Sequence, residues 1–263
     1  GMSGEVVVAG GAGDNAAAAC GIGAIQPGEG FVSLGTSGVL FVSNDRFRPN
    51  TRGAVHAFCH AIPNTWHQMG VILSATDSLN WLAKITGQDP AKLAGAAEAG
   101  FKGPGEEIFL PYLSGERTPH NNAAARGSLT GLSHSTDPAL LAQAVMEGVA
   151  FAFRDCQRVL KDAGTEMGQL LAVGGGSKSN LWLRLIATNL ETEIALPEDG
   201  DFGGALGVAR LGLCAAEGAD PSEIMTMPAI KRVIKPEPAL KSAYSEQYAR
   251  YRALYPAIEE ARK

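Results

Sequence analysis

The sequence lacks the features that mark membrane, secreted and nucleic-acid-binding proteins. No apolar run reaches the roughly 18 residues that a membrane-spanning helix requires, and the N-terminal residues do not have the regions of a signal peptide. Lysine and arginine form no run or basic helix face, and the chain of 263 residues carries a formal net charge of -5. Nucleic acid and anionic membranes are therefore not expected as partners. The sequence predicts a cytoplasmic protein whose partner is a small molecule.

Cysteine is scarce and shows no pairing pattern. The four cysteines are scattered singly without C-x-x-C spacing, which is typical of a reducing compartment, and we interpret them as small buried hydrophobes. They are Cys20, Cys59, Cys156 and Cys214.

Metal binding and serine hydrolysis find little support in the sequence. His56 and His60 fall in a predicted strand, where residues four apart lie about 13 Å from each other. Zinc ligands must instead converge to within about 2.3 Å of the ion. No G-x-S-x-G motif surrounds any serine, so a hydrolytic triad is not expected either.

Glycine, in contrast, is abundant, with 33 copies between short apolar runs. Strand-like and helix-like windows alternate, which favours an α/β architecture. The predicted strands are 5–9, 31–34, 39–43, 54–62, 65–72, 170–173 and 193–196. The predicted helices are 74–85, 90–99, 138–163, 180–189 and 203–216, together with a terminal helix whose tyrosines at helical spacing are expected to dock on the core. No linker divides the chain, which predicts one domain.

Asp14 is a lone carboxylate after a glycine-rich turn, where the predicted strand 5–9 runs into a helix beginning at Asn15. A carboxylate at this position can accept a proton from a substrate hydroxyl, and the glycines of residues 10–13 let a ligand approach the backbone closely. The simpler interpretation is that Asp14 caps the helix. The two roles are compatible.

Two further glycine-rich turns have the composition of anion-binding loops. Residues 35–38 join two predicted strands in a tight hairpin and offer consecutive backbone N–H groups and two hydroxyls to phosphate, although a plain hairpin turn would use the same residues. Residues 174–180 lead from a strand into a helix N-terminus, where backbone donors and the helix dipole favour anions. Neither G-x-G-x-x-G nor the P-loop motif is present there, which counts against both of those nucleotide-binding folds.

The order and spacing of these segments resemble the C-terminal half of the FGGY carbohydrate kinases, and most closely the xylulokinases among them. The similar segments are 9–17, 33–38, 55–60 (VHAFCH), 109–120 (FLPYLSGERTPH), 127–132 with the helix that follows, and 174–177. One departure is Leu140, which stands where the family pattern usually has a polar residue.

The resemblance implies two actin-like, ribonuclease H-like domains that hold MgATP and a sugar in the cleft between them. Residues 1–263 would be the C-terminal, nucleotide-binding domain, without the N-terminal domain that binds the sugar and supplies most Mg²⁺ ligands. Gly1 before Met2 resembles the residue that a cleaved purification tag leaves. The implied reaction is phosphorylation of D-xylulose by ATP to D-xylulose 5-phosphate, with this chain inactive alone.

The resemblance assigns Asp14 as the general base that takes the proton of the sugar hydroxyl. The implied nucleotide site consists of glycine, hydroxyl and amide residues: Gly35, Thr36 and Ser37 at the β- and γ-phosphates, and Asn80, Gly175, Gly176, Ser177 and Asn180 toward the α-phosphate, ribose and adenine. No metal ligand is assigned to this chain.

Several alternatives stay open at this point. Arg117 can clamp a phosphate or hold its own loop through Glu116 or a carbonyl. The substrate can be that of another FGGY kinase, such as gluconate, ribulose or glycerol. A non-catalytic actin-like module that binds ATP to control assembly is a candidate of a different class, and a homodimer is compatible with all of these.

Overall fold

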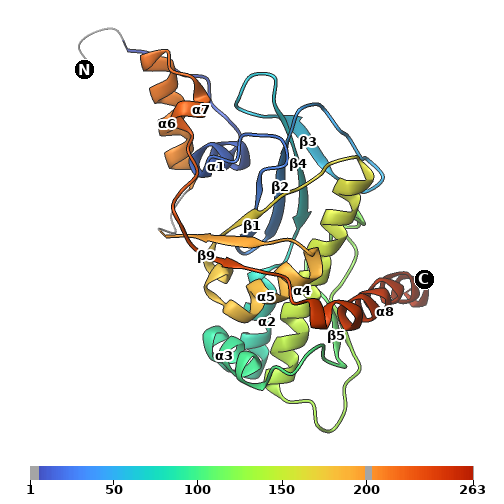
Figure 1. Ribbon diagram of the computed structural model, residues 1–263. Coiled ribbons are helices and arrows are strands. Elements are labelled where there is room, and N and C mark those ends of the chain that lie inside the picture. Colours follow the sequence, from blue (N-terminus) through green and yellow to red (C-terminus); the bar gives the residue numbers. More distant parts are fainter. Residues whose placement is uncertain (1–5, 199–202, 263) are drawn as a thin grey trace.

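A seven-stranded sheet forms the centre of the structure, a computed structural model that describes residues 6–198 and 203–262 (Figure 1). Within those residues the strand order is β3-β4-β2-β1-β7-β8-β9. The strands of this sheet are β1 (Gly30–Leu34), β2 (Gly38–Asn44), β3 (His56–Cys59), β4 (Trp66–Ile72), β7 (Leu170–Val173), β8 (Ile194–Pro197) and β9 (Ile230–Ile234). A separate antiparallel pair consists of β5 (Ile108–Leu110) and β6 (Ser128–Thr130).

Helices cover both faces of the large sheet (Figure 1). They are α1 (Asp14–Ile22), α2 (Thr76–Thr86), α3 (Pro90–Gly100), α4 (Pro138–Asp162), α5 (Asn180–Leu190), α6 (Gly204–Glu217), α7 (Pro221–Ile224) and α8 (Lys241–Ala261). Among the described residues, no helix is long and apolar enough to cross a membrane.

The alternation of side chains along β1 explains why helices pack on both faces. Phe31 points toward α1 and lies in a cluster with Ile22, whereas Val32 and Leu34 point to the other face and join the larger core under α4 and α5. Successive side chains of a strand point to opposite faces, so a strand that is covered on both sides must be apolar throughout. This pattern confirms the predicted α/β architecture.

The longest helix, α4, begins and ends where its sequence signals predict. The side chain of Asp137 accepts a hydrogen bond from the Leu140 N–H over 2.9 Å, and Pro138 occupies the first helical position. Gly164, just beyond the end, has φ of +80°. The tyrosines of α8 pack on this helix, and Tyr244 and Tyr251 are both 1% exposed, so their predicted docking on the core is confirmed.

Several predictions for the first 60 residues are wrong in detail. Residues 6–9 form no strand, and Val8 is 88% exposed; residue 5 and the Gly1–Met2 pair lie outside the described residues. Asp14 is the first residue of α1 rather than its cap, which is Gly13. The strand predicted at 54–62 is shorter, His56–Cys59, because it pairs only with β4 at the sheet edge.

Other departures concern short or polar elements. The strands β5, β6 and β9 were not predicted: the first two have three residues each, and β9 is an edge strand with charged, mostly exposed side chains. Cys20 and Cys156 are buried as predicted, but Cys59 is exposed and Cys214 is only partly buried. It follows that local patterns identified the elements of the core better than those of the periphery.

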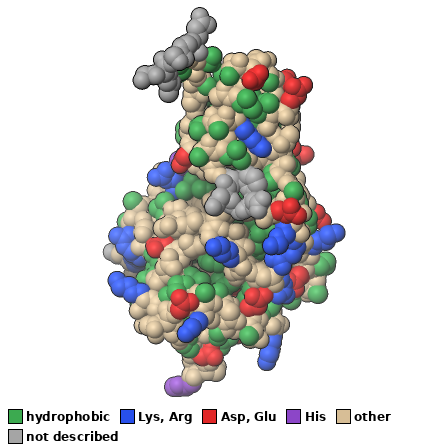
Figure 2. Space-filling view, turned by 90° about the vertical axis from the view of Figure 1, so that its left-hand side faces the viewer, with side chains coloured by type: hydrophobic (Ala, Val, Ile, Leu, Met, Phe, Trp, Pro, Cys, Tyr) green, Lys and Arg blue, Asp and Glu red, His purple; other side chains and the backbone are tan. Residues whose placement is uncertain are grey.

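Helix α6 packs along α1 at one end of the molecule (Figure 1). The backbone of the two helices meets at Gly207, where an added Cβ would clash with the carbonyl of Ala17. The outer side of α6 is also apolar, and Figure 2 shows apolar side chains gathered over this upper part, with Leu206, Val208 and Leu213 each more than a third exposed.

Candidate functional site

The two glycine-rich turns, residues 35–37 and 174–176, lie side by side at the carboxyl ends of two central strands. They follow the carboxyl ends of β1 and β7, which are parallel neighbours with Ser33 paired to Val173. A Cβ added to Gly174 would lie 2.8 Å from the Leu34 carbonyl oxygen, and one on Gly176 would lie 2.9 Å from the Leu34 Cβ. Glycine is therefore required for this contact, and ligands of α/β sheets bind at the carboxyl ends of the strands.

The 35–37 turn directs its carbonyl groups inward. The Gly35 carbonyl accepts hydrogen bonds from the N–H and the hydroxyl of Thr76 over 3.0 and 2.7 Å, and the Thr36 carbonyl accepts one from the Ala75 N–H over 2.8 Å. The N–H groups of Thr36 and Ser37 have no acceptor among the residues that the structure describes. Adjacent N–H groups without acceptors form a nest that suits a phosphate oxygen.

A cavity of about 450 Å³ opens beside these turns, between α2, α3 and α5. Its lining includes three of the predicted residues, Asn80, Gly175 and Gly176. Asn180 lies at its wall, because its side-chain amide donates to Glu98 over 2.9 Å and Glu98 lines the cavity. The cavity has the size and the largely apolar character of a small-molecule site.

Other lining residues of this cavity escaped the sequence analysis. They are Thr76, Leu79, Pro90, Ala91, Ala94, Gly95, Glu98 and Trp182, whereas Lys178 and Ser179 belong to the predicted turn 174–180. The side of α3 that faces the cavity is made of small residues, and this pattern was visible in the sequence as a run of alanine and glycine. A run of small residues does not indicate which helix or cavity it will face, so its role in the site could not be inferred from the sequence alone.

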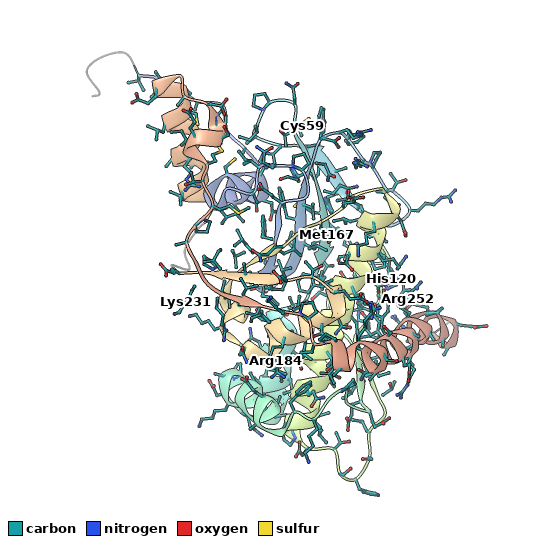
Figure 3. The ribbon with its side chains drawn as sticks, in the orientation of Figure 1. Cys59, His120, Met167, Arg184, Lys231 and Arg252 are labelled. Atoms are coloured by element: carbon teal, nitrogen blue, oxygen red, sulfur yellow. The ribbon has the colours of Figure 1, made fainter. Side chains whose placement is uncertain are left out.

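Ser177 faces a second hollow of about 860 Å³, on the other side of the 174–176 turn. The Ser177 hydroxyl donates to the Gly174 carbonyl over 2.6 Å. Three cations, Lys178, Lys231 and Arg232, line the same hollow together with Glu198. Lys231 projects from β9 in Figure 3. The excess of positive charge here favours an anionic ligand, and it comes from an edge strand that the sequence analysis did not predict.

Asp14 lies apart from the turns, at the start of α1. It lines a hollow of about 300 Å³ with Asn15, Phe58, Cys59, His67 and other residues, none of which belongs to the two turns. One carboxylate oxygen accepts from the Asn15 N–H over 2.8 Å and from its side-chain amide over 3.1 Å. Cys59, at the end of β3, and Lys231 lie far apart in Figure 3, so this hollow and the cationic one are separate.

The other side chains around Asp14 are uncharged. Phe58 is 50% exposed, and its ring lies 5.8 Å from that of His67. Burial lowers the pKa of His67 to about 4, so its imidazole is uncharged at neutral pH. His67 is 4% exposed whereas Asp14 is exposed, so the free carboxylate oxygen of Asp14 is the basic group of this hollow that a ligand can reach.

Arg117 contacts its own surroundings rather than the turns. Its guanidinium lies 3.2 Å from the imidazole Nε2 of His56, and its backbone N–H donates to the Glu116 carboxyl over 2.7 Å. Burial and this guanidinium together lower the pKa of His56. Of the two roles left open by the sequence, the contacts favour the one in which Arg117 holds its loop.

Among the described residues, no group of three or more His, Cys, Asp and Glu side chains is placed to hold a metal ion.

Comparison with known proteins identifies the family. Residues 30–216 match the model of the C-terminal domain of the FGGY family of carbohydrate kinases. The chain belongs to the FGGY family. It is 42% identical over 260 residues to the xylulose kinase of Escherichia coli K12, a match that covers 97% of this chain and 53% of that relative. The chain therefore spans about half the length of the curated relatives it matches.

Solved structures of FGGY kinases share the fold. A xyloylose kinase from Brucella ovis is 59% identical, with a TM-score of 0.96 over 99% of this chain and 54% of that one. The xylulose kinase of Rhodospirillum rubrum is 28% identical, with a TM-score of 0.85 over 95% of this chain and 51% of that one. The actin-like ATPase fold and the family resemblance predicted from the sequence are confirmed.

Proposed function

We propose that this chain is the nucleotide-binding, C-terminal part of a kinase that transfers the γ-phosphate of ATP to D-xylulose, giving D-xylulose 5-phosphate. The observation that carries the proposal is the pair of adjacent glycine turns, with backbone N–H groups free to bind anions, beside a cavity of about 450 Å³. The relatives at 42% and 59% identity, which are called xylulose and xyloylose kinases, support the choice of sugar.

In the proposed arrangement, ATP extends from the cavity to the 35–37 turn. The adenine and ribose would occupy the cavity between α2, α3 and α5, near Asn80 and Asn180. The α-phosphate would lie at Gly175 and Gly176, close to the N-terminus of α5, where the helix dipole favours negative charge. The β- and γ-phosphates would extend to the 35–37 turn. Ser177, expected at the α-phosphate, faces the hollow lined by Lys178, Lys231 and Arg232, whose positive charge favours phosphate.

Asp14 would act as the general base. Its free oxygen takes the proton of the sugar hydroxyl as the hydroxyl oxygen bonds to the γ-phosphorus, and the bond from phosphorus to the β,γ-bridging oxygen breaks to release ADP. The two hydrogen bonds from Asn15 to the other oxygen fix the carboxylate in place. Such orientation of the attacking group is the main contribution that a protein makes to phosphoryl transfer.

The N-terminal half would supply the rest of the site. Asp14 and the turns lie in separate hollows, so a second domain is needed to hold the sugar and to bring its hydroxyl to the γ-phosphate. The exposed apolar side chains of α6 provide a surface that such a domain can cover. Mg²⁺, bound mainly by the ATP phosphates and by carboxylates of that half, would neutralise the charge that develops on them.

A substrate panel tests the proposal. The full-length kinase is assayed with ATP and D-xylulose, gluconate, ribulose or glycerol, and D-xylulose is expected to give the highest kcat/KM. This chain alone, tested in parallel, is expected to show negligible turnover because it lacks the sugar site. A higher kcat/KM for another sugar would reassign the substrate. Binding of ATP without phosphorylation of any sugar would favour the assembly module instead.

A further inference from the structure

The carboxyl group of Glu116 is connected to the 35–37 turn through Leu73 and does not line the cavity proposed for ATP. It belongs to a segment, residues 116–118, that runs beside the end of β4. Thr118 joins this segment to Val71: its N–H donates to the Val71 carbonyl over 3.1 Å, and its hydroxyl oxygen accepts from the Val71 N–H over 3.0 Å. The segment is thus fixed to the strand two residues before the part that supports the turn.

A short series of hydrogen bonds connects Glu116 with the turn. The Glu116 carboxyl accepts from the Leu73 N–H over 3.1 Å, and the carbonyl of the same Leu73 accepts from the Ser37 hydroxyl over 3.3 Å. The next residues, Ala75 and Thr76, bind the carbonyl groups of the turn. The position of residues 73–76 therefore sets the position of the turn, and Glu116 is the side chain that holds the start of this stretch.

Glu116 is held in a dry environment. Its side chain is 1% exposed, and its second oxygen is buried without a hydrogen-bond partner among the described residues, as is the hydroxyl of the neighbouring Ser74. Burial, with a smaller contribution from the charge of Asp155 on α4, raises the pKa of Glu116 to about 8, although the two backbone N–H donors and the Arg117 guanidinium act to lower it. The group is therefore mostly protonated at neutral pH, and glutamine is a close substitute.

We propose that Glu116 is a positioning residue for phosphoryl transfer: through Leu73 it holds the 35–37 turn in the geometry that binds the γ-phosphate in the transition state. The proposal rests on the proposed function of that turn. A displacement of the turn by a fraction of an ångström would misplace its N–H donors relative to the transferring phosphoryl group, and errors of about 1 Å in such groups cost about 100-fold in rate.

Three variants of the full-length kinase test this role. Glu116→Ala removes the acceptor, and kcat is expected to fall by about tenfold or more, while the KM for the sugar changes by less than about twofold because the sugar does not contact the turn. Glu116→Gln keeps an acceptor oxygen for Leu73 and is expected to retain kcat within about threefold. Glu147→Ala is the control, since Glu147 is equally buried but bonds Gln143, Tyr244 and Gln247 instead.

The control separates positioning from stability. Glu147→Ala is expected to lower the melting temperature at least as much as Glu116→Ala, yet to leave kcat within about twofold of the parent at a temperature where both are folded. The positioning role is contradicted if Glu116→Ala keeps the parental kcat, or if Glu147→Ala loses the same fraction of kcat.

Hydrogen exchange provides a readout that does not depend on turnover. With a non-hydrolysable ATP analogue bound, the amides of residues 35–37 are expected to exchange faster in Glu116→Ala than in the parent and in Glu147→Ala. Unchanged exchange there would refute the positioning of the turn by Glu116. If these amides exchange faster in Glu116→Ala but the parent phosphorylates no sugar, Glu116 still holds the turn and it is the proposed function that fails.

Discussion

Replacing Gly175 by alanine tests the phosphate site with little disturbance of the fold. An added Cβ at this position has no protein atom within 4 Å, in contrast with Gly174, where φ is +89° and the Cβ would lie 2.8 Å from a carbonyl oxygen. We therefore expect the free energy of unfolding of Gly175→Ala to stay within about 0.5 kcal/mol of the parent, as for other substitutions in open space.

We expect this substitution to weaken the binding of ATP. The new methyl group would occupy space that a phosphate must enter to reach the N–H groups of Gly175 and Gly176. Losing one hydrogen bond to a charged group costs about 1.5 to 3 kcal/mol, which weakens binding by roughly 10- to 150-fold. Gly174→Ala, in contrast, is expected to lower the stability itself, because it adds both a clash and backbone strain.

Calorimetry of ATP binding and chemical denaturation of the full-length kinase measure both quantities. Gly212→Ala is the matched control, since its Cβ also has no protein atom within 4 Å but lies on α6, away from the turns. That control is expected to bind ATP like the parent and to gain up to about 1 kcal/mol of stability from helix propensity. Parental ATP affinity in Gly175→Ala would refute the placement of phosphate at this turn.

Two further predictions concern the pH dependence of stability and the packing that positions Asp14. Burial raises the pKa of Glu147 to about 7 and that of Glu116 to about 8, so above pH 6.5 the folded state binds more protons than the unfolded state. The free energy of unfolding should therefore fall as pH rises from 6.5 to 7.5, by at most about 1.4 kcal/mol per pH unit for each group. In Glu147→Gln, chemical denaturation should show a smaller decrease of this free energy with pH. A decrease equal to that of the parent would contradict the raised pKa of Glu147. Below pH 6.5, three buried histidines oppose this trend: His60, His67 and His120. Their pKa values are lowered to about 4 in the folded state, so the unfolded state binds more protons at these side chains. In the second prediction, Gly207→Val forces α6 away from Ala17 and should displace α1, which carries Asp14. We expect kcat to fall while the ATP affinity measured by calorimetry is retained. A parental kcat in that variant would show that α6 does not position Asp14.

The elements of the core could be predicted from sequence because their signals are local. The cap at Asp137, the proline after it and the glycine beyond the end define α4 without reference to the rest of the chain. The hairpin of β1 and β2 and the turn after β7 were predicted for the same reason. The edge strand β9 was missed because its exposed charged residues carry no apolar alternation, and its pairing with β8 depends on the fold.

The candidate site likewise combines features that local sequence predicts with features that depend on the fold. Glycine turns with hydroxyl residues can be identified from composition, and their order along the chain resembles the FGGY pattern. The cations of the second hollow, Lys231 and Arg232, come from a distant strand, and Glu98 reaches the cavity from α3. Asp14 was predicted to cap a helix that starts at Asn15, but in the structure it is the first residue of α1 and is held by Asn15. Long-range pairing decides where the two cations and Glu98 lie, and no local pattern encodes it.

The substitution Asp14→Asn tests the central claim most directly. Asparagine keeps the size and one acceptor oxygen of the side chain but cannot accept the proton of the sugar hydroxyl. In the full-length kinase, we expect the single-turnover rate of D-xylulose phosphorylation to fall by about 100- to 10,000-fold, the range for loss of a general base, with ATP affinity unchanged. A single-turnover rate near that of the parent would contradict the assignment of Asp14 as the base.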